Sequence, residues 1–99
     1  MENSKASFRD YLNLEKNYSD LTVNAYLKDV VFFENFIANH FDQENLCEVN
    51  YSQIRSWIVS LIDAGIAAVS VNRKISSLKA YYRFLLKTKQ VEISPLLKH

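Results

Sequence analysis

Glycine and proline each occur only once in the sequence, at Gly65 and Pro95. Folds built from sheets need many tight turns, and tight turns depend largely on these two residues. A chain with so few of them is expected to form a few long elements, which are helices. Its 99 residues are enough for about one domain, whose core is too small for an elaborate active site.

Apolar residues recur at helical spacing over about residues 5–16, 20–41, 50–64 and 67–89, which predicts four helices. Asn50 and Gln53 have the spacing of a capping box at the start of the third helix. Gly65 is placed to end that helix, because glycine adopts the left-handed conformation at little cost. We therefore predict an all-α fold, a four-helix bundle. Four side chains from the middle of the apolar stripes are predicted to be largely buried: Trp57, Leu61, Leu78 and Tyr82.

The predicted core faces run along each of the last three helices. The second helix also carries Phe32 and Phe36 outside its main apolar arc, as in a helix that lies centrally in a bundle or contacts a partner. The predicted core faces are Val23, Leu27, Val30, Ile37 and Phe41 on the second helix, Ile54, Trp57, Ile58, Leu61 and Ile62 on the third, and Val71, Ile75, Leu78, Tyr82, Leu85 and Leu86 on the fourth.

Charge is distributed unevenly between the two halves of the chain, although the net charge is only +1. Residues 1–50 hold four basic and nine acidic residues, whereas residues 51–99 hold eight basic and two acidic residues. No acidic residue lies between Asp63 and Glu92. This asymmetry favours a polyanionic partner for the second half. The alternative is that the two halves attract each other within the fold.

One flank of the predicted fourth helix carries much of this positive charge. At about 100° per residue, five side chains fall on one continuous stripe beside the apolar face. Lysine and arginine reach phosphates, while asparagine and serine form short hydrogen bonds to phosphates or base edges. The pattern indicates nucleic-acid binding, with an ordinary solvated helix face as the alternative. We call these five residues the basic stripe: Asn72, Ser76, Lys79, Arg83 and Lys87.

Three sequence motifs resemble the N-terminal core-binding domain of tyrosine recombinases, the Xer and phage-integrase family. SVNRKISSLKAYYRFL, which starts at Ser70, resembles the family pattern T-I-N-R-x-L-S-A-L-R-x-F-Y-x-F-L, with Lys79 in place of the usual arginine. Ser94-Pro95 lies where the family often has Asn-Pro. LEKNYSDLTVNAYLKDVVFF, which starts at Leu14, resembles L-x-x-x-L-S-x-x-T-x-x-A-Y-x-R-D-L-x-x-F, with Thr22, Tyr26, Asp29 and Phe33 matching and Lys28 replacing arginine.

The resemblance implies a SAM-like four-helix bundle that forms one half of a C-shaped clamp around duplex DNA. It implies that the second and fourth helices face the major groove and the flanking backbone, and that other recombinase protomers are partners in a synaptic assembly. Residues 1–93 would form this domain, and residues 94–99 would begin a linker to a catalytic domain that this sequence lacks. The DNA-binding residues that the resemblance implies are Thr22, Asn24, Lys28, Ser70, Asn72, Arg73, Ser76, Lys79 and Arg83.

The resemblance also implies that strand cleavage belongs to the other half of the clamp, so we expect no enzymatic activity and no catalytic residues here. His40 and Cys47 are a poor metal pair, because zinc sites need three or four ligands at recognisable spacing. No metal and no cofactor is expected. The N-terminal residues lack the apolar core of a signal peptide, and no apolar run approaches the ~20 residues that span a bilayer, so we expect a cytoplasmic protein without membrane contact.

Two other functions are open at this stage. A helical protein-interaction module would use Phe32 and Phe36 to bind a partner helix, and its basic stripe would only aid solubility. A helix-turn-helix repressor would use the turn at Gly65, although a fourth helix of about 20 residues is long for a recognition helix.

Overall fold

The computed structural model describes residues 2–96, and every regular element in that range is helical. The helices are α1 (Glu2–Asp10), which continues into a π-helical turn η1 (Tyr11–Glu15), α2 (Asp20–Phe41), a short 3-10 helix η2 (Leu46–Glu48), α3 (Tyr51–Asp63) and α4 (Ala68–Lys87). The prediction of an all-α fold with four main helices is therefore confirmed for the described residues.

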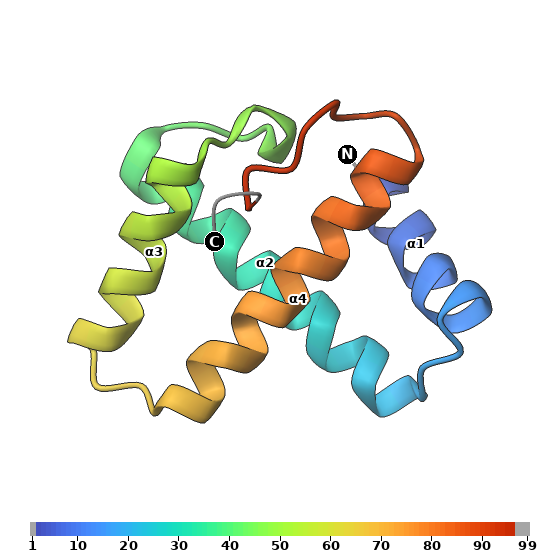
Figure 1. Cartoon of the computed structure of the whole chain (residues 1–99), viewed down its shortest axis with the longest axis horizontal. Helices are drawn as coiled ribbons and strands as arrows, with labels where there is room; N and C mark the ends of the chain where they lie inside the picture. The colour runs from blue at the N-terminus through green and yellow to red at the C-terminus, as the bar shows by residue number, and fades with distance from the viewer. Residues whose placement is uncertain (1, 97–99) are drawn as a thin grey trace.

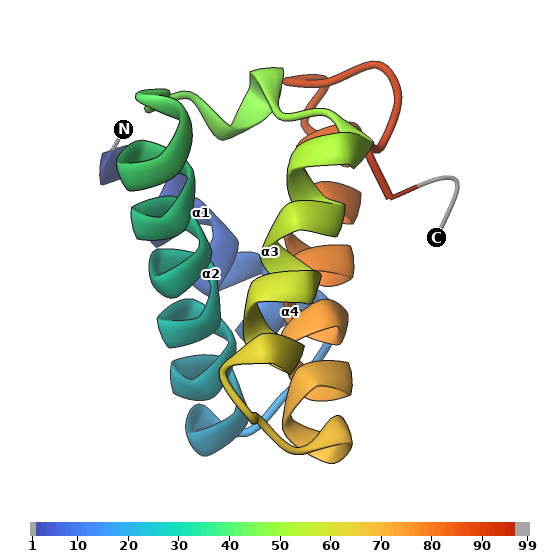
Figure 2. The same cartoon turned by 90° about the vertical axis from the view of Figure 1, so that its left-hand side faces the viewer.

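Helices α2 and α4 cross near their middles, with α3 on one side of the crossing and α1 on the other (Figure 1). Both α2 and α4 begin at the same end of the molecule, the lower end in Figures 1 and 2. The N-terminal residues of these two helices therefore share one end of the bundle.

Local signals in the sequence set the helix ends. The Ser19 hydroxyl caps α2 by accepting a hydrogen bond from the Thr22 backbone N–H at 3.3 Å. The capping box at α3 is confirmed, since Asn50 and Gln53 each accept the other's backbone N–H at 3.0 Å. Gly65 follows α3 with a φ of 83°, which confirms its predicted role in ending that helix.

The core lies between the four helices and contains the side chains expected there. Trp57, Leu78 and Tyr82 are completely buried and Leu61 is 3% exposed, so all four core predictions are confirmed. The Tyr82 hydroxyl donates a hydrogen bond to the Leu46 carbonyl oxygen at 2.7 Å, which ties the η2 segment to α4.

Helix α4 is buried on two faces, and only one of them was predicted. Its second buried face packs against α1, where the Phe8 ring lies 5.1 Å from Tyr81 and 5.6 Å from Phe84, centroid to centroid. Because α1 covers this face, α4 is the most enclosed helix of the bundle. Along this face Tyr81 and Phe84 meet α1, whereas Ser77 bonds Asp29 of α2. All three are buried, as is Ala80.

Three residues predicted on core faces are exposed instead. Ile62, Phe41 and Leu86 are 59%, 40% and 36% exposed. Each lies within the last turn of its helix, where the apolar stripe extends beyond the neighbouring helices. The apolar pattern alone does not show where a neighbouring helix stops.

The domain boundary predicted at residues 93 and 94 stays a prediction. Leu96, inside the predicted linker, is buried, and its backbone N–H bonds the Ser94 hydroxyl at 3.1 Å. Residues 97–99 of that linker lie outside the described range. Among residues 2–96, no helix combines the length and the apolar character needed to cross a membrane.

Candidate nucleic-acid interface

The basic stripe on α4 is open to solvent along its whole length, since all five of its residues are exposed. Lys79 and Arg83 form no ion pair with any residue in the range 5–96, whose side chains the structure describes. Lys87 differs, because its ammonium donates a hydrogen bond to the Glu15 carboxylate, which raises the pKa of Lys87. Lys79 and Arg83 are therefore the members of the stripe whose charge is available to a polyanion.

The predicted contact residues on α2 are accessible to different degrees. Lys28 and Asn24 are exposed, although the Asn24 side-chain oxygen accepts a hydrogen bond from Arg9 at 3.4 Å. Thr22 is half-buried, and its hydroxyl accepts a hydrogen bond from the capping Ser19 at 3.1 Å. The Thr22 hydroxyl thus contacts the residue that caps the N-terminus of α2.

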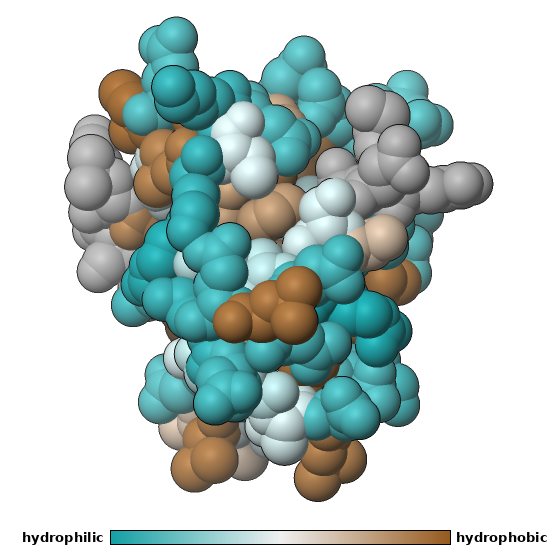
Figure 3. Space-filling model, turned by 90° about the vertical axis from the view of Figure 1, so that its right-hand side faces the viewer, coloured by the Kyte–Doolittle hydropathy of each residue, from teal (hydrophilic) through white to brown (hydrophobic). Residues whose placement is uncertain are grey.

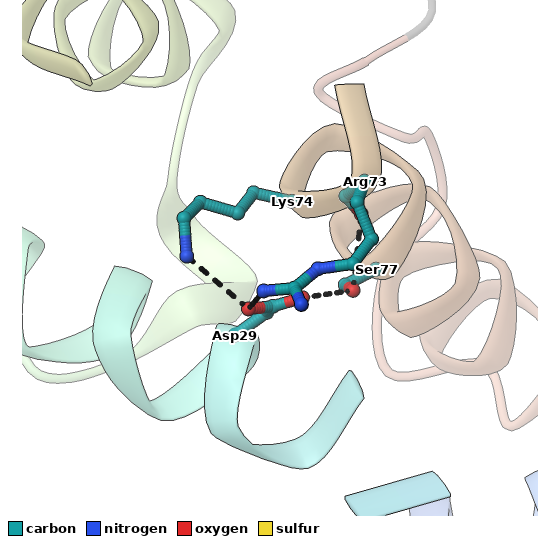
Figure 4. Close-up of polar contacts among 4 residues, drawn as sticks. All are labelled: Asp29, Arg73, Lys74 and Ser77. Atoms are coloured by element: carbon teal, nitrogen blue, oxygen red, sulfur yellow. Dashed lines mark hydrogen bonds and ion pairs between the residues drawn. The ribbon is translucent and has the colours of Figure 1, made fainter. Parts of the chain in front are cut away.

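The buried carboxylate of Asp29 joins α2 to α4 (Figure 4). Asp29 is only 2% exposed. Its Oδ1 atom accepts hydrogen bonds from Arg73 Nη2 at 2.8 Å and Lys74 Nζ at 3.4 Å, and its Oδ2 atom accepts one from the Ser77 hydroxyl at 2.6 Å. A buried charge is costly unless it is paired and hydrogen-bonded, and Asp29 has partners for both oxygens.

This cluster was not predicted from the sequence, although a signal for it was present. Around α2, Asp29 lies within about 40° of Ala25, Phe33 and Phe36. A charged residue on an apolar flank needs a partner of opposite charge. Arg73 and Lys74 were candidate partners for Asp29, because the fourth helix contains no acidic residue that could pair with them.

The nine predicted contact residues lie on two flanks and not on one surface. Asp29 and Ser77 mark the sides of α2 and α4 that face each other. At about 100° per residue, Ser70 and Arg73 lie within about 40° of Ser77 around α4. The other predicted residues of α4 lie about 100–160° away, on its outer flank, and Asn24 and Lys28 are rotated by similar angles from Asp29 around α2. The outer group on α4 consists of Asn72, Ser76, Lys79 and Arg83.

The aromatic side chains that would serve a protein partner already have contacts within the chain. Phe32 is 45% exposed, but its ring lies 6.5 Å from Trp57 and 4.9 Å from the Lys74 ammonium. The half-buried Phe36 stacks on His40 with ring centroids 4.1 Å apart. Among the described residues, no three His, Cys, Asp or Glu side chains are grouped so that they could hold a metal.

The sequence model of the phage integrase N-terminal SAM-like domain matches residues 6–89 of this chain. The chain belongs to this family. The SAM-like, integrase-type character of the predicted four-helix fold is thereby confirmed, and so is the resemblance found in the three sequence motifs.

The chain is similar to part of longer tyrosine recombinases. It is 36% identical over 88 residues to tyrosine recombinase XerC of Pediococcus pentosaceus, and 35% identical over 92 residues to XerC of Oceanobacillus iheyensis. It is 33% identical over 94 residues to tyrosine recombinase XerD of Rickettsia bellii. These alignments cover 89%, 93% and 93% of this chain but only 29%, 30% and 30% of the relatives. No solved structure gave a significant match.

Proposed function

We propose that this chain is the duplex DNA-binding domain of a site-specific tyrosine recombinase. It would clamp the recombination site while a separate domain cleaves and exchanges the strands. The observation that carries the proposal is the match of residues 6–89 to the integrase N-terminal domain family. Because the chain spans about 30% of the relatives' length, strand cleavage is assigned to sequence outside it, and the chain alone is proposed to be non-catalytic.

The surface of α4 supports this proposal on physical grounds. The phosphate backbone supplies most of the non-specific affinity of DNA-binding proteins, through lysine and arginine. Lys79 and Arg83 are exposed, lie one turn apart and have no acidic neighbour on their helix. Lys28 and Arg73 add two further exposed cations on α2 and α4. The proposed partners are duplex DNA and other recombinase protomers in the cytoplasm. The proposed contact residues are the nine implied by the resemblance: Thr22, Asn24, Lys28, Ser70, Asn72, Arg73, Ser76, Lys79 and Arg83.

A protein-interaction module remains the second candidate, because Phe32 is 45% exposed. Its contacts with Trp57 and Lys74 reduce the apolar surface that it offers to a partner helix. On the side of the molecule where α1 lies, hydrophobic side chains form separate small patches within a hydrophilic surface (Figure 3). These observations favour DNA over a helical partner.

Removing single cations from the basic stripe tests the proposal. The chain is expected to bind non-specific duplex with a dissociation constant of roughly 10⁻⁴–10⁻⁶ M near physiological salt. Lys79→Ala and Arg83→Ala should each weaken binding and flatten the plot of log affinity against log salt by about one unit, since each cation releases one counterion. Charge reversal in Lys79→Glu should weaken binding further. Fluorescence anisotropy on a labelled duplex across a salt series measures both quantities.

Arg55→Ala is the matched control, because Arg55 is exposed on α3 and forms no ion pair with residues 5–96. It should leave the affinity and the salt slope nearly unchanged. Equal affinities and slopes for Lys79→Glu, Arg83→Ala and Arg55→Ala would remove the basic stripe from the binding surface. Binding that is insensitive to salt would contradict the DNA-binding function itself.

A further inference from the structure

The cluster around Asp29 is built like a support for Arg73. The Asp29 carboxylate is buried and fixed on both oxygens, so it cannot rotate away from the guanidinium. Ser77 is completely buried and holds Oδ2 from the same helix that carries Arg73. Arg73 contacts only Oδ1, through Nη2 at 2.8 Å. The fixed carboxylate therefore restrains the end of a long side chain that would otherwise move freely.

The restrained guanidinium still has donors to offer. An arginine side chain carries five N–H donors in a planar fork, and among residues 5–96 the only partner of this guanidinium is Asp29. The Arg73 side chain is 51% exposed, whereas that of Lys74 is 16% exposed. The Arg73 guanidinium is therefore open to solvent in the N-terminal half of α4, one turn from Ser70. Helix α2 begins at the same end of the molecule (Figure 2).

Lys74 keeps the cluster attractive to a polyanion. Its ammonium is held between Asp29 Oδ1 at 3.4 Å and the Phe32 ring at 4.9 Å, so it is turned toward the protein. One carboxylate faced by two cations leaves a net charge of +1. Because Lys74 also pairs with Asp29, the ion pair between Arg73 and Asp29 does not cancel the positive charge of the cluster.

We propose that Asp29 is a positioning residue that presents Arg73 to the major-groove edge of a guanine in duplex DNA. An arginine whose fork is fixed in orientation suits the O6 and N7 acceptors of guanine, the commonest specific contact of this side chain. A contact made only with phosphate requires a positive charge but no fixed fork. This inference rests on the proposed DNA-binding function and adds a base preference to it.

The test measures base preference separately from affinity. Duplexes are selected by the wild-type chain from a random-sequence pool, and the winning duplex is then remade with 7-deazaguanine, which lacks N7, at each guanine in turn. At one guanine, the substitution should weaken wild-type binding several-fold. Changing that base pair should weaken binding roughly 5- to 150-fold, the range of a good bidentate base contact. Arg73→Gln should lose this preference.

Asp29→Asn tests the positioning role, because it keeps the size of the side chain and removes the charge. It should lose most of the preference at the same guanine, while circular dichroism and thermal melting report whether the variant is folded. Folded Asp29→Asn should keep its salt-dependent affinity for the other duplexes, whereas a merely structural role would weaken binding to every duplex. Arg83→Gln is the matched control: it should weaken binding to every duplex equally and keep the preference.

The outcomes separate the two proposals. Salt-dependent binding without any guanine that depends on Arg73 would overturn the positioning role and leave the DNA-binding function intact. The same result would follow if folded Asp29→Asn kept the full preference. Absence of salt-dependent binding by the wild-type chain would overturn both proposals.

Discussion

Replacing Leu78 with alanine is expected to lower the free energy of unfolding by about 2–5 kcal/mol. Leu78 is completely buried in the middle of α4, on the face that also carries Ile75 and Tyr82. Alanine would lose the transfer free energy of the removed groups and leave a cavity that the surrounding helices can only partly fill. Because small domains have a total stability of only about 5–15 kcal/mol, this one change should remove a large share of it.

Urea unfolding followed by circular dichroism measures this loss, and Leu86→Ala is the matched control. Leu86 lies on the same helix but is 36% exposed. Its truncation should cost clearly less than that of Leu78, because about a third of the Leu86 side chain is already in water. A loss below about 1 kcal/mol for Leu78→Ala, short of the range for buried leucines, would mean that this face of α4 is not the core.

The features that the sequence predicted well depend on residues close together in the chain. Helix periodicity, the Asn50–Gln53 capping box and the turn at Gly65 each involve only a few neighbouring residues. The middle of each apolar stripe was also predictable, because Trp57 and Leu78 lie where any packing of the helices would bury them. Errors occurred at the last turns, where burial depends on the length of a neighbouring helix.

The second buried face of α4 could not be predicted from its own sequence. Ser77 and Ala80 read as the edge of a polar flank, yet both are buried. Phe8 and Tyr11 bring α1 against Phe84 on this side of the helix. Similarly, Asp29 meets Ser77 across 48 positions of sequence. Such contacts depend on how the helices cross, which helical periodicity does not encode.

The candidate site was predictable in composition but not in arrangement. The wheel of the fourth helix alone was sufficient to place Lys79 and Arg83 on an exposed stripe, as the structure has them. It could not show that Arg73 faces α2 and bonds Asp29. Whether all nine proposed residues contact DNA stays a prediction. Because the residues lie on two flanks, substitutions on each flank test it separately.

Raising the pH above about 10 is expected to lower the stability of the folded chain, because two core tyrosines resist ionisation in the folded state. Burial, and then the charges of Cys47 and Glu34, raise the pKa of Tyr81 from 10.0 to about 12. Burial, followed by Tyr81 and Cys47, raises the pKa of Tyr82 still further. Tyr82 is completely buried, with its hydroxyl bonded to the Leu46 carbonyl oxygen, so an ionised phenolate there would lose that bond and remain unsolvated.

The direction of the pH effect follows from proton binding by the two states. Below a pH of about 10 both phenols are protonated whether the chain is folded or unfolded, so their contribution to stability is complete. Above it the unfolded chain releases protons that the folded chain retains, and stability falls with rising pH. For Tyr81 the fall extends to a pH of about 12, and for Tyr82 it continues beyond.

Tyr82→Phe separates this effect from general alkaline damage. At neutral pH the variant should be less stable by roughly 1–3 kcal/mol, because the Leu46 carbonyl loses its donor inside the core. Above a pH of about 10 its stability should fall less steeply than that of the wild type, since the proton that the folded wild type retains on Tyr82 is absent from the variant. Urea midpoints measured at a series of pH values give both slopes. Parallel slopes for the two proteins would show that Tyr82 is not the group whose ionisation opens the core.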